Sequence, residues 1–517
     1  MSIKALLGFT VIPAAILGGL VAACLSKRIR DLFFMLLVFL SPMIERLDVN
    51  FFSHEWYRGT SRGFEVSLLD VLALSLLGSS VLAPRRGESR GYWPASLGLM
   101  LLFFLYSCAN VAISDPQLFG LFELFKMLRA FILVLAVAFY LRSERELRLL
   151  IFSLGMLVCY EGLLALEQRY VEGQHRVPGS IDDSNSLSVF LCLTTPIFVA
   201  AFNSRIPKLL KLLCILAIPL ASVAMILTIS RAGVVILGLV LAGVTLWTVS
   251  YRLTPRRIAM SLVIILAATG VMAKSWKTLH ARFEESSLKD EYANKRALGR
   301  GYYIRVARAI AADQWFGVGL NNWSYWVSNK YGPRLGYRFV PYSGVDTEPS
   351  DVIPPGSNVD EAQAAPAHSL GALTLGELGL PGLVLFSLLW LRWFQMGASF
   401  LWPRTADPMR RMGVGLFFAF LGIFLQSQFE WVFRHSPIFY EFHILLGCLA
   451  SLYYVKKKEK RLLRAQLKVA PIENLQLEPC WPSDEAVVEG AKRVFSPAPL
   501  LPNQGVLTES AGLNTPA

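Results

Sequence analysis

The sequence predicts an all-α polytopic membrane protein with one large polar loop, and three observations support this fold class. Of the 517 residues, 54% are hydrophobic and the mean hydropathy is +0.48, well above the range of a soluble domain. Apolar runs long enough to cross a bilayer recur along most of the chain. Between residues 274 and 366 these runs stop, and no segment there is long enough to span. We therefore expect about 12 or 13 transmembrane helices and one large, partly helical loop.

Each predicted span follows from its length, because about twenty residues that rise 1.5 Å each cross a hydrocarbon core of about 30 Å. The confident spans lie near residues 6–25, 67–83, 95–113, 120–140, 148–166, 185–202, 209–228, 232–250, 258–273, 370–401, 413–429 and 437–455. A shorter candidate lies near residues 32–44. The first run has neither a strongly basic start nor a clear small-residue cleavage site, so we interpret it as a retained helix rather than a signal peptide.

The connections between these runs alternate in charge, which predicts the topology. The basic ones are residues 26–30, 84–90, 142–148, 204–208, 251–257, 403–411 and 456–461. Because basic residues collect in cytoplasmic loops, the formal net charge of +13 is explained by topology and these connections face the cytoplasm. The remaining connections then face outward, namely residues 45–66, 167–184, 274–369 and 430–436 and the turn before Arg231. Thirteen spans place the N-terminus outside and twelve place both termini inside, but the large loop faces outward in both cases.

The chain is expected to have four parts. These are an N-terminal transmembrane bundle (1–273), a periplasmic loop (274–369), C-terminal transmembrane helices (370–455) and a cytoplasmic tail (456–517) that is largely disordered. The lipid bilayer is the first expected partner. Nucleic acid is not expected as a partner, because the basic residues are scattered in short clusters. The seven cysteines include no Cys-x-x-Cys pair, which supports neither a disulfide framework nor a thiolate zinc site.

Two polar side chains near the predicted outer boundary are candidates for chemistry. Arg231 lies between two spans that almost no loop separates. An interfacial arginine can simply extend its head to water, but its planar donor fork also suits a phosphate group. His368 opens the apolar segment that follows the loop, where it is either a satisfied polar residue or a proton acceptor. The other outward histidines lack the i, i+4 spacing of zinc ligands, so we expect no metal site.

Other outward residues are further candidates. Arg176 precedes a span, and Asn185 stands among residues that also suit a helix cap. Arg300 and Arg305 lie at the start of a predicted amphipathic helix over residues 302–313. Glu377 lies two and a half helical turns after the histidine and could instead pair with an arginine of a neighbouring helix.

A glycine pair follows the predicted amphipathic helix, in Gly317-Val-Gly319. Glycine-rich phosphate loops follow a strand and open a helix, whereas this pair follows a helix. We therefore do not interpret it as a nucleotide-binding loop.

Several short segments, taken in order, resemble one family. They are Arg176, Gly179 and Asn185 before one span, Thr228-Ile-Ser-Arg-Ala-Gly233 at the start of another, Arg300, Ala307 and Gly317-Val-Gly319 in the loop, His368-Ser369 at its end, and Glu377-Leu-Gly-Leu-Pro-Gly382 after it. Over about residues 170–385 this ordered set resembles the bacterial O-antigen ligase and O-antigen polymerase superfamily. Ile304 and Trp315-Phe316 depart from the family pattern, and the acidic, proline-rich insert at residues 346–366 is longer than expected.

The resemblance implies an inner-membrane glycosyltransferase that works on the periplasmic side without metal or another cofactor. It would move a glycan from an undecaprenyl diphosphate-linked donor to the hydroxyl of a glycan, lipid A–core or protein acceptor, with inversion at the anomeric carbon. His368 would be the catalytic base. The residues that would bind the diphosphate are Arg231, Arg300 and Arg176, with Arg305, Asn185 and Glu377 as secondary candidates.

An O-antigen ligase is the expected activity, and three alternatives stay open. An O-antigen or exopolysaccharide polymerase uses the same machinery on another acceptor. A polysaccharide transporter would need broken helices or carboxylates at mid-membrane depth, whereas Asp70, Glu161 and Glu430 lie near span ends. In a non-catalytic membrane scaffold, the arginines and the histidine would each be replaceable.

Overall fold

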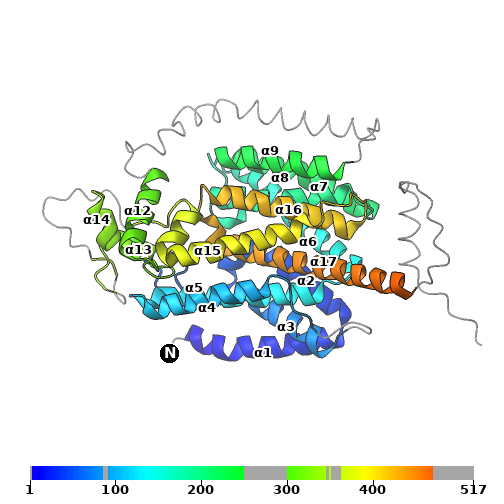
Figure 1. The fold of residues 1–517 in the computed structure, drawn as a ribbon, viewed down its shortest axis with the longest axis horizontal. Coiled ribbons are helices and arrows are strands. Elements are labelled where there is room, and N and C mark those ends of the chain that lie inside the picture. Colours follow the sequence, from blue (N-terminus) through cyan, green and yellow to red (C-terminus); the bar gives the residue numbers. More distant parts are fainter. Residues whose placement is uncertain (1–2, 85–90, 250–299, 345–347, 351–362, 470–517) are drawn as a thin grey trace, which may run out of the picture. The chain divides into compact units, whose positions relative to one another are not determined.

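The computed structural model describes residues 3–84, 91–249, 300–344, 348–350 and 363–469. It divides into one unit of residues 1–459 and a second of residues 460–517, of which only the end of the last helix is described. Apart from one short hairpin and an isolated bridge, the regular structure of the described residues is helical (Figure 1).

The N-terminal half of the chain holds most of the long helices. In order they are α1 (Ile3–Leu25), α2 (Lys27–Leu40), the 3₁₀ turn η1 (Ser41–Arg46), β1 (Asp48–Ser53), β2 (Gly63–Ser67), α3 (Leu68–Leu82), α4 (Leu97–Ile113), α5 (Gln117–Tyr140), α6 (Glu144–Tyr170), η2 (Gly179–Ile181), α7 (Ser184–Phe202), α8 (Lys208–Leu227) and α9 (Arg231–Thr248). The two strands pair antiparallel as a hairpin between η1 and α3.

The C-terminal half contains the loop elements and three more long helices. They are α12 (Arg300–Asp313), α13 (Trp323–Trp326), η3 (Val327–Tyr331), α14 (Gly332–Arg334), α15 (Leu370–Ala398), α16 (Pro408–Ser427), η4 (Val432–Arg434) and α17 (Ser436–Val469). The predicted amphipathic helix is thus confirmed as α12. The insert at residues 346–366 lies mostly outside the described residues.

The predicted fold class, an all-α polytopic membrane protein, is confirmed. Eight of the described helices are long and apolar enough to cross a membrane: α1, α6, α7, α8, α9, α15, α16 and α17. Helices α3 and α4 are apolar but shorter. Helix α5 is 24 residues long and carries the buried charges Glu123, Lys126 and Arg129. The predicted span at residues 258–273 lies outside the described residues, so the total of 12 or 13 spans stays a prediction.

The short candidate span near residues 32–44 corresponds to α2 and η1, which run from one end of the helix bundle to the other. Near its start, Arg30 Nη1 donates to the carbonyl oxygen of Ala83 at 3.2 Å, at the end of α3. At its far end, Arg46 forms an ion pair of 2.7 Å with Asp182, beside the start of α7. A helix of 14 residues followed by a six-residue 3₁₀ turn rises about 33 Å, which is enough to cross a bilayer.

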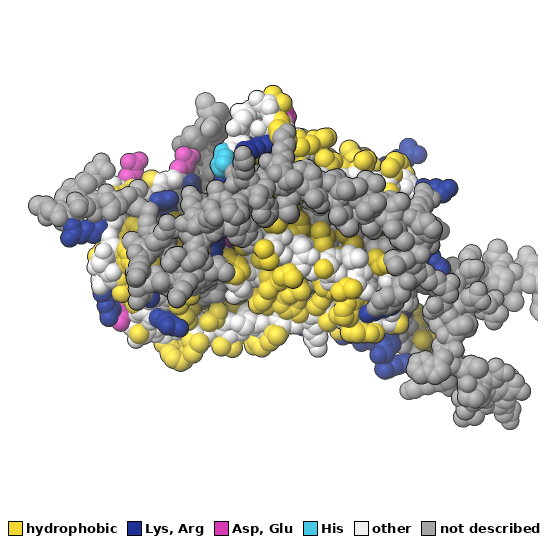
Figure 2. All heavy atoms as spheres, turned by 90° about the horizontal axis from the view of Figure 1, so that it is seen from above, with side chains coloured by type: hydrophobic (Ala, Val, Ile, Leu, Met, Phe, Trp, Pro, Cys, Tyr) yellow, Lys and Arg dark blue, Asp and Glu magenta, His cyan; other side chains and the backbone are white. Residues whose placement is uncertain are grey.

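The connections predicted to face the same side do meet in the structure. At the end of the bundle that carries α12–α14 in Figure 1, called the outer end because it is predicted to face outward, Glu45 contacts His435 and the loop meets the α16–α17 connection. At the inner end, the backbone N–H of Arg205 donates to the carbonyl oxygen of Ala406 at 3.1 Å, which joins two basic connections. In Figure 2, hydrophobic side chains gather along the middle of the molecule between these ends, as a membrane-spanning bundle requires.

The described part of the loop has its own small core, which packs on the outer end of α15. Tyr302, Val306 and Ile310 of α12 bury their side chains together with Trp323 and Leu373. This core fixes α12 beside α15. The start of α12 is thereby held near the start of α15.

Two glycine segments bring the loop and α15 into close backbone contact. Gly317 and Gly319 both have positive φ, and Gly379 has φ +65° at a break inside α15. The backbone N–H of Val318 donates to the carbonyl oxygen of Gly376 at 2.9 Å. A Cβ added to Gly379 would lie only 2.0 Å from the carbonyl oxygen of Trp315. The glycines are therefore explained by backbone packing.

Candidate functional site

Three side chains from distant parts of the sequence meet at the outer end of the bundle. His368 Nδ1 lies 2.6 Å from Glu430 Oε2, and Arg300 Nη2 lies 3.7 Å from Glu430 Oε1. The side chains of Glu430, Arg300 and His368 are 13%, 22% and 36% exposed. A largely buried carboxylate thus joins an arginine to a histidine that solvent can reach.

Local structure explains why these three meet. The Ser369 hydroxyl caps α15 by accepting from the backbone N–H of Ala372, which places His368 just outside the helix. Arg300 begins α12, and its guanidinium lies over the ring of Phe429, 5.3 Å from the centroid. Tyr303, one turn along α12, brings its ring to 5.5 Å from that of His368. The starts of α12 and α15 and the neighbouring aromatic rings therefore position Arg300 and His368 beside Glu430.

Arg231, the other main candidate, lies at the same end of the bundle as this group. It begins α9, which packs against α16, and Figure 1 shows the two helices side by side. Along that contact a Cβ on Gly422 would lie 3.4 Å from Val240 Cγ1. Gly422 lies five residues before the end of α16 at Ser427, and Val240 lies nine residues after the start of α9 at Arg231. Arg231 therefore begins α9 at the end of the bundle where α16 ends and the segment with Glu430 follows.

Arg176 supports the turn that leads to Arg231. Its Nε donates to the carbonyl oxygen of Thr228 at 3.2 Å, and its Nη2 donates to Asn185 Oδ1 at 2.9 Å. Ile229, inside the same turn, has φ +54°, a backbone conformation that a β-branched residue rarely adopts. Arg176 and Asn185 thus tie the start of α7 to the α8–α9 turn.

The two other secondary candidates point elsewhere. Arg305 Nη2 donates to the hydroxyl of Tyr337 at 2.8 Å, within the loop. Glu377 is buried and pairs with Arg434, whose Nε also donates to Glu123 at 3.1 Å. The pairing of Glu377 with an arginine is confirmed, although that arginine lies in the short turn η4 rather than in a helix. Neither residue joins the His368 group.

A second histidine–carboxylate pair lies at the other end of the same α16–α17 connection. His435 Nε2 lies 3.0 Å from Glu45 Oε1, and its Nδ1 lies 3.1 Å from Ser186 Oγ. This pair joins η1 to the starts of α7 and α17.

Glu430 and Arg434 were not predicted as site residues. Their partners are far away in the sequence, so no spacing rule connects them. The available signal was the predicted outward connection itself. It contains Glu430, Arg434 and His435 within six residues, and the residues between them are apolar or aromatic. Among the residues that the structure describes, no three His, Cys, Asp or Glu side chains are grouped to hold a metal ion.

One comparison with known proteins finds a match in the middle of the chain. A family model described as O-antigen ligase matches residues 216–387, from within α8 to within α15. This range includes Arg231, Arg300, His368 and Glu377, whereas Glu430 lies outside it. A search of curated proteins finds no match to the chain.

Proposed function

We propose that this chain, which carries an O-antigen ligase domain of the O-antigen ligase and polymerase superfamily, transfers a glycan from a polyprenyl diphosphate carrier to an acceptor hydroxyl. The transfer takes place at the outer end of the bundle, on the periplasmic side of the bacterial inner membrane. One observation carries the proposal. His368, Arg300 and Glu430 converge there, at the end of the bundle where α9 starts with Arg231.

His368 is the base in this proposal, and Glu430 sets its tautomer. When Nδ1–H donates to the Glu430 carboxylate, Nε2 carries no proton and can accept one from the acceptor hydroxyl. The same carboxylate then stabilises the imidazolium that forms. The partial exposure of His368 leaves room for an acceptor to approach.

Arginines stabilise the leaving group. As the acceptor oxygen forms its bond to the anomeric carbon, the carbon–oxygen bond to the diphosphate breaks, and that oxygen leaves with the electron pair. In this proposal Arg231 and Arg300 meet the growing negative charge, and Arg176 supports the turn before Arg231. Fixed donors of this kind each lower a barrier by about 3–4 kcal/mol. Attack from the face opposite the diphosphate gives inversion.

The histidine provides the first test. His368→Ala should abolish glycan transfer in cells, because no other group in the proposal accepts the hydroxyl proton, while the protein stays inserted at its normal level. The matched control is His175→Ala, which removes an exposed histidine from an outward loop of the same bundle. Surface glycans and lipid-linked glycans are measured by extraction and gel analysis. Wild-type transfer by His368→Ala contradicts the proposal.

Arg231 provides the second test. Arg231→Lys keeps the charge but loses the planar donor fork, so transfer should fall by about 10²–10³-fold, the effect of removing one fixed donor. Arg46→Lys is the control, because Arg46 is an exposed arginine at the same end of the bundle. Initial rates with a purified lipid-linked glycan measure the effect. Equal rates for the two variants would show that Arg231 does not bind the diphosphate.

Analysis of surface and lipid-linked glycans in a deletion strain distinguishes the possible activities. Loss of polymer from lipid A with accumulation of long lipid-linked chains indicates a ligase, which is the activity we propose. Surface molecules that carry a single repeat indicate a polymerase. Loss of surface glycan with lipid-linked carriers retained on the cytoplasmic side indicates a transporter.

A further inference from the structure

Two large aromatic side chains, Trp315 and Phe316, are exposed in the loop between α12 and the short helix α13. They are 60% and 51% exposed. Neither ring belongs to the core that packs α12 against α15, or to another buried cluster of the described residues. Large apolar side chains in contact with water are unfavourable, and a patch of them marks a contact surface. The proposed reaction gives these rings no role.

The backbone of this pair is fixed against two helices. The carbonyl oxygen of Trp315 accepts from the backbone N–H of Leu380 in α15 at 3.2 Å, and that of Phe316 accepts from Asn110 Nδ2 in α4 at 2.8 Å. Gly379 brings α15 so close that a Cβ there would lie 2.0 Å from the Trp315 carbonyl oxygen. The pair therefore contacts the bundle through its backbone, and both rings stay at the surface.

The pair lies at the outer end of α4. Asn110 stands three residues before Ile113, the last residue of that helix, and its Oδ1 also accepts from the backbone N–H of Leu320 at 2.9 Å. A short turn then leads to Gln117, where α5 begins. Both helices correspond to predicted spans. The pair thus lies at the level where these spans are expected to meet the membrane surface.

The apolar surface continues from the rings along the two helices. On α15 no side chain from Leu370 to Gly379 is exposed, whereas after the break every third or fourth residue is, namely Leu380, Val384, Leu388 and Leu391. On α4 one face carries the exposed residues Leu101, Leu102, Leu105 and Ile113. The two helices pack against each other, and α15 is long and apolar enough to cross a membrane. These faces are therefore lipid-facing, and the rings extend them outward.

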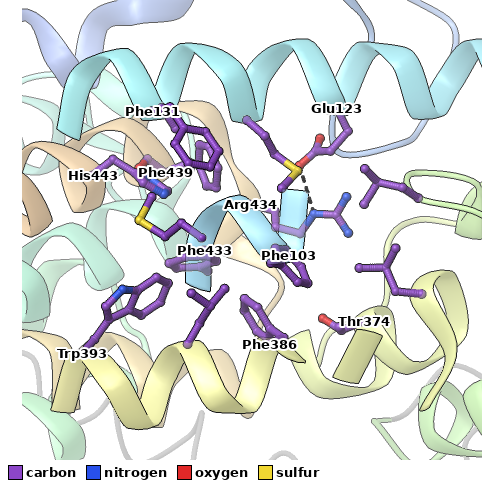
Figure 3. Close-up of a pocket in the computed structure, with 16 residues that line it drawn as sticks. Phe103, Glu123, Phe131, Thr374, Phe386, Trp393, Phe433, Arg434, Phe439 and His443 are labelled. Atoms are coloured by element: carbon purple, nitrogen blue, oxygen red, sulfur yellow. Dashed lines mark hydrogen bonds and ion pairs between the residues drawn. The ribbon is translucent and has the colours of Figure 1, made fainter. Parts of the chain in front are cut away.

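The interior behind these faces has no room for the rings. A cavity of about 70 Å³ lies there, and Figure 3 shows Phe103 of α4 and Phe386 of α15 among the side chains around it. A cavity that takes up a benzene ring measures about 150 Å³. Neither Trp315 nor Phe316 can therefore turn inward, so their rings have to be covered from outside the bundle.

Basic side chains stand beside the pair. Asp313, the last residue of α12, pairs with Arg334 at 2.6 Å and with Lys330 at 4.0 Å. The two basic side chains are 55% and 48% exposed. One carboxylate thus meets two cations, which leaves positive charge close to Trp315. Positive charge next to an apolar surface suits lipid, because the head groups carry phosphate and the chains are apolar.

We propose that Trp315 and Phe316 insert into the outer leaflet of the bilayer and anchor the loop in the lipid. Aromatic rings collect at this depth of membrane proteins, where the ring is in apolar surroundings and its edge meets the head groups. Because α12 carries Arg300 at its other end, the anchor also sets where the candidate site stands relative to the lipid surface. The insertion does not depend on the glycosyl transfer reaction.

Photo-crosslinking of the full chain tests this contact. The photoreactive amino acid p-benzoylphenylalanine replaces Phe316, the protein is placed in nanodiscs of phosphatidylethanolamine and phosphatidylglycerol, and adducts are identified by mass spectrometry. Position 316 should give lipid adducts in a yield similar to that of the same probe at Leu105, which is 56% exposed on the lipid-facing side of α4. The probe at Ser343, exposed elsewhere in the loop, should give no lipid adduct above background.

The neighbouring ring supplies the matched variant. Trp315→Glu places a carboxylate at the membrane surface, so the lipid adducts at position 316 should fall by about tenfold, which corresponds to a loss of 1.4 kcal/mol in the free energy of insertion. Trp315→Ser removes the ring without adding a charge and should give an intermediate yield. Trp93→Glu is the control, because Trp93 is 67% exposed just before the inner end of α4 and should leave the yield at position 316 unchanged.

Four results would overturn the proposal. A yield at position 316 as low as that at Ser343 would show that the rings face water. A crosslinked dimer in place of lipid adducts would assign this surface to a second copy of the chain. A crosslink within the chain would show that another of its segments covers the rings. An unchanged yield in Trp315→Glu and Trp315→Ser would show that the indole ring does not hold the loop in the lipid.

Discussion

Glu430 organises the candidate site because it contacts both His368 and Arg300, to which the proposed reaction assigns roles. One of its oxygens lies near His368 Nδ1 and the other near Arg300. An imidazole that can rotate or change tautomer is a poor base, since its free nitrogen need not point at the acceptor. The Glu430 carboxylate fixes both the orientation of the imidazole ring and the nitrogen that carries the proton. It also links Arg300, the first residue of α12, to His368, which lies just before α15.

Replacement of this carboxylate should impair transfer without removing the base. Glu430→Gln keeps the size of the side chain, but its amide cannot stabilise an imidazolium, and its NH₂ can donate to Nδ1 and force the proton onto Nε2. The transfer rate should fall by about 10²–10⁴-fold, the usual contribution of general base catalysis. Rates with purified protein in lipid measure the effect, and binding of the lipid-linked donor serves as the internal control because it should change little. A rate within twofold of wild type, on the order of experimental error, would remove Glu430 from the mechanism.

The sequence could suggest His368 and Arg300 as candidate site residues but not their shared partner. Both residues stand at recognisable places, where an apolar run starts and where an amphipathic helix starts. Glu430 lies 62 residues after the histidine, and only the packing of α15 against α16 brings them together. Arg434 was missed for the same reason, because its partners are on α5 and α15.

At the scale of elements, the relative position of α12 and α15 depends on glycines. The loop backbone at residues 315–319 lies against the break in α15, with hydrogen bonds from Val318 to Gly376 and from Leu380 to Trp315. Gly379 has φ +65° and ψ −169°, a conformation open essentially only to glycine. Hydropathy predicted both helices but not the break, because a single glycine does not interrupt an apolar run. The glycine motifs were visible in the sequence, but only the structure shows that they allow the loop backbone to pack against the break in α15.

A methyl group at this contact should loosen the loop. Gly379→Ala forces a Cβ to within 2.0 Å of the Trp315 carbonyl oxygen and strains the backbone, so the free energy of unfolding should fall by about 1–3 kcal/mol or more. Gly371→Ala, on the same helix, meets no atom within 4 Å and should be neutral or slightly stabilising. Thermal unfolding in detergent, followed by tryptophan fluorescence, compares the two variants. Equal midpoints would mean that the loop and α15 do not pack as described.

At the scale of the whole molecule, two independent observations give the same arrangement of the ends. Charge alternation in the sequence sorted the connections into two sets, and the described contacts join members within each set. The short helix α2 also fits this alternation, because η1 extends it to the outer end of the bundle. Hydropathy alone could not settle that helix, since a 14-residue helix followed by a 3₁₀ turn has no full-length apolar run. Helix α2 is long enough to cross a bilayer only because η1 continues it.

The side of the membrane that each end faces can be tested by cysteine labelling. Ser343 is exposed in the large loop, and Lys458 is exposed near the inner end of α17, within a run of basic residues that keeps its charge when one is replaced. A membrane-impermeant maleimide should therefore label Ser343→Cys in spheroplasts and should label Lys458→Cys only after the membrane is lysed. The six described native cysteines are free and lie in helices, so the unsubstituted chain gives the background. Labelling of Lys458→Cys in intact spheroplasts would reverse the orientation, and a periplasmic reaction at His368 would then be impossible.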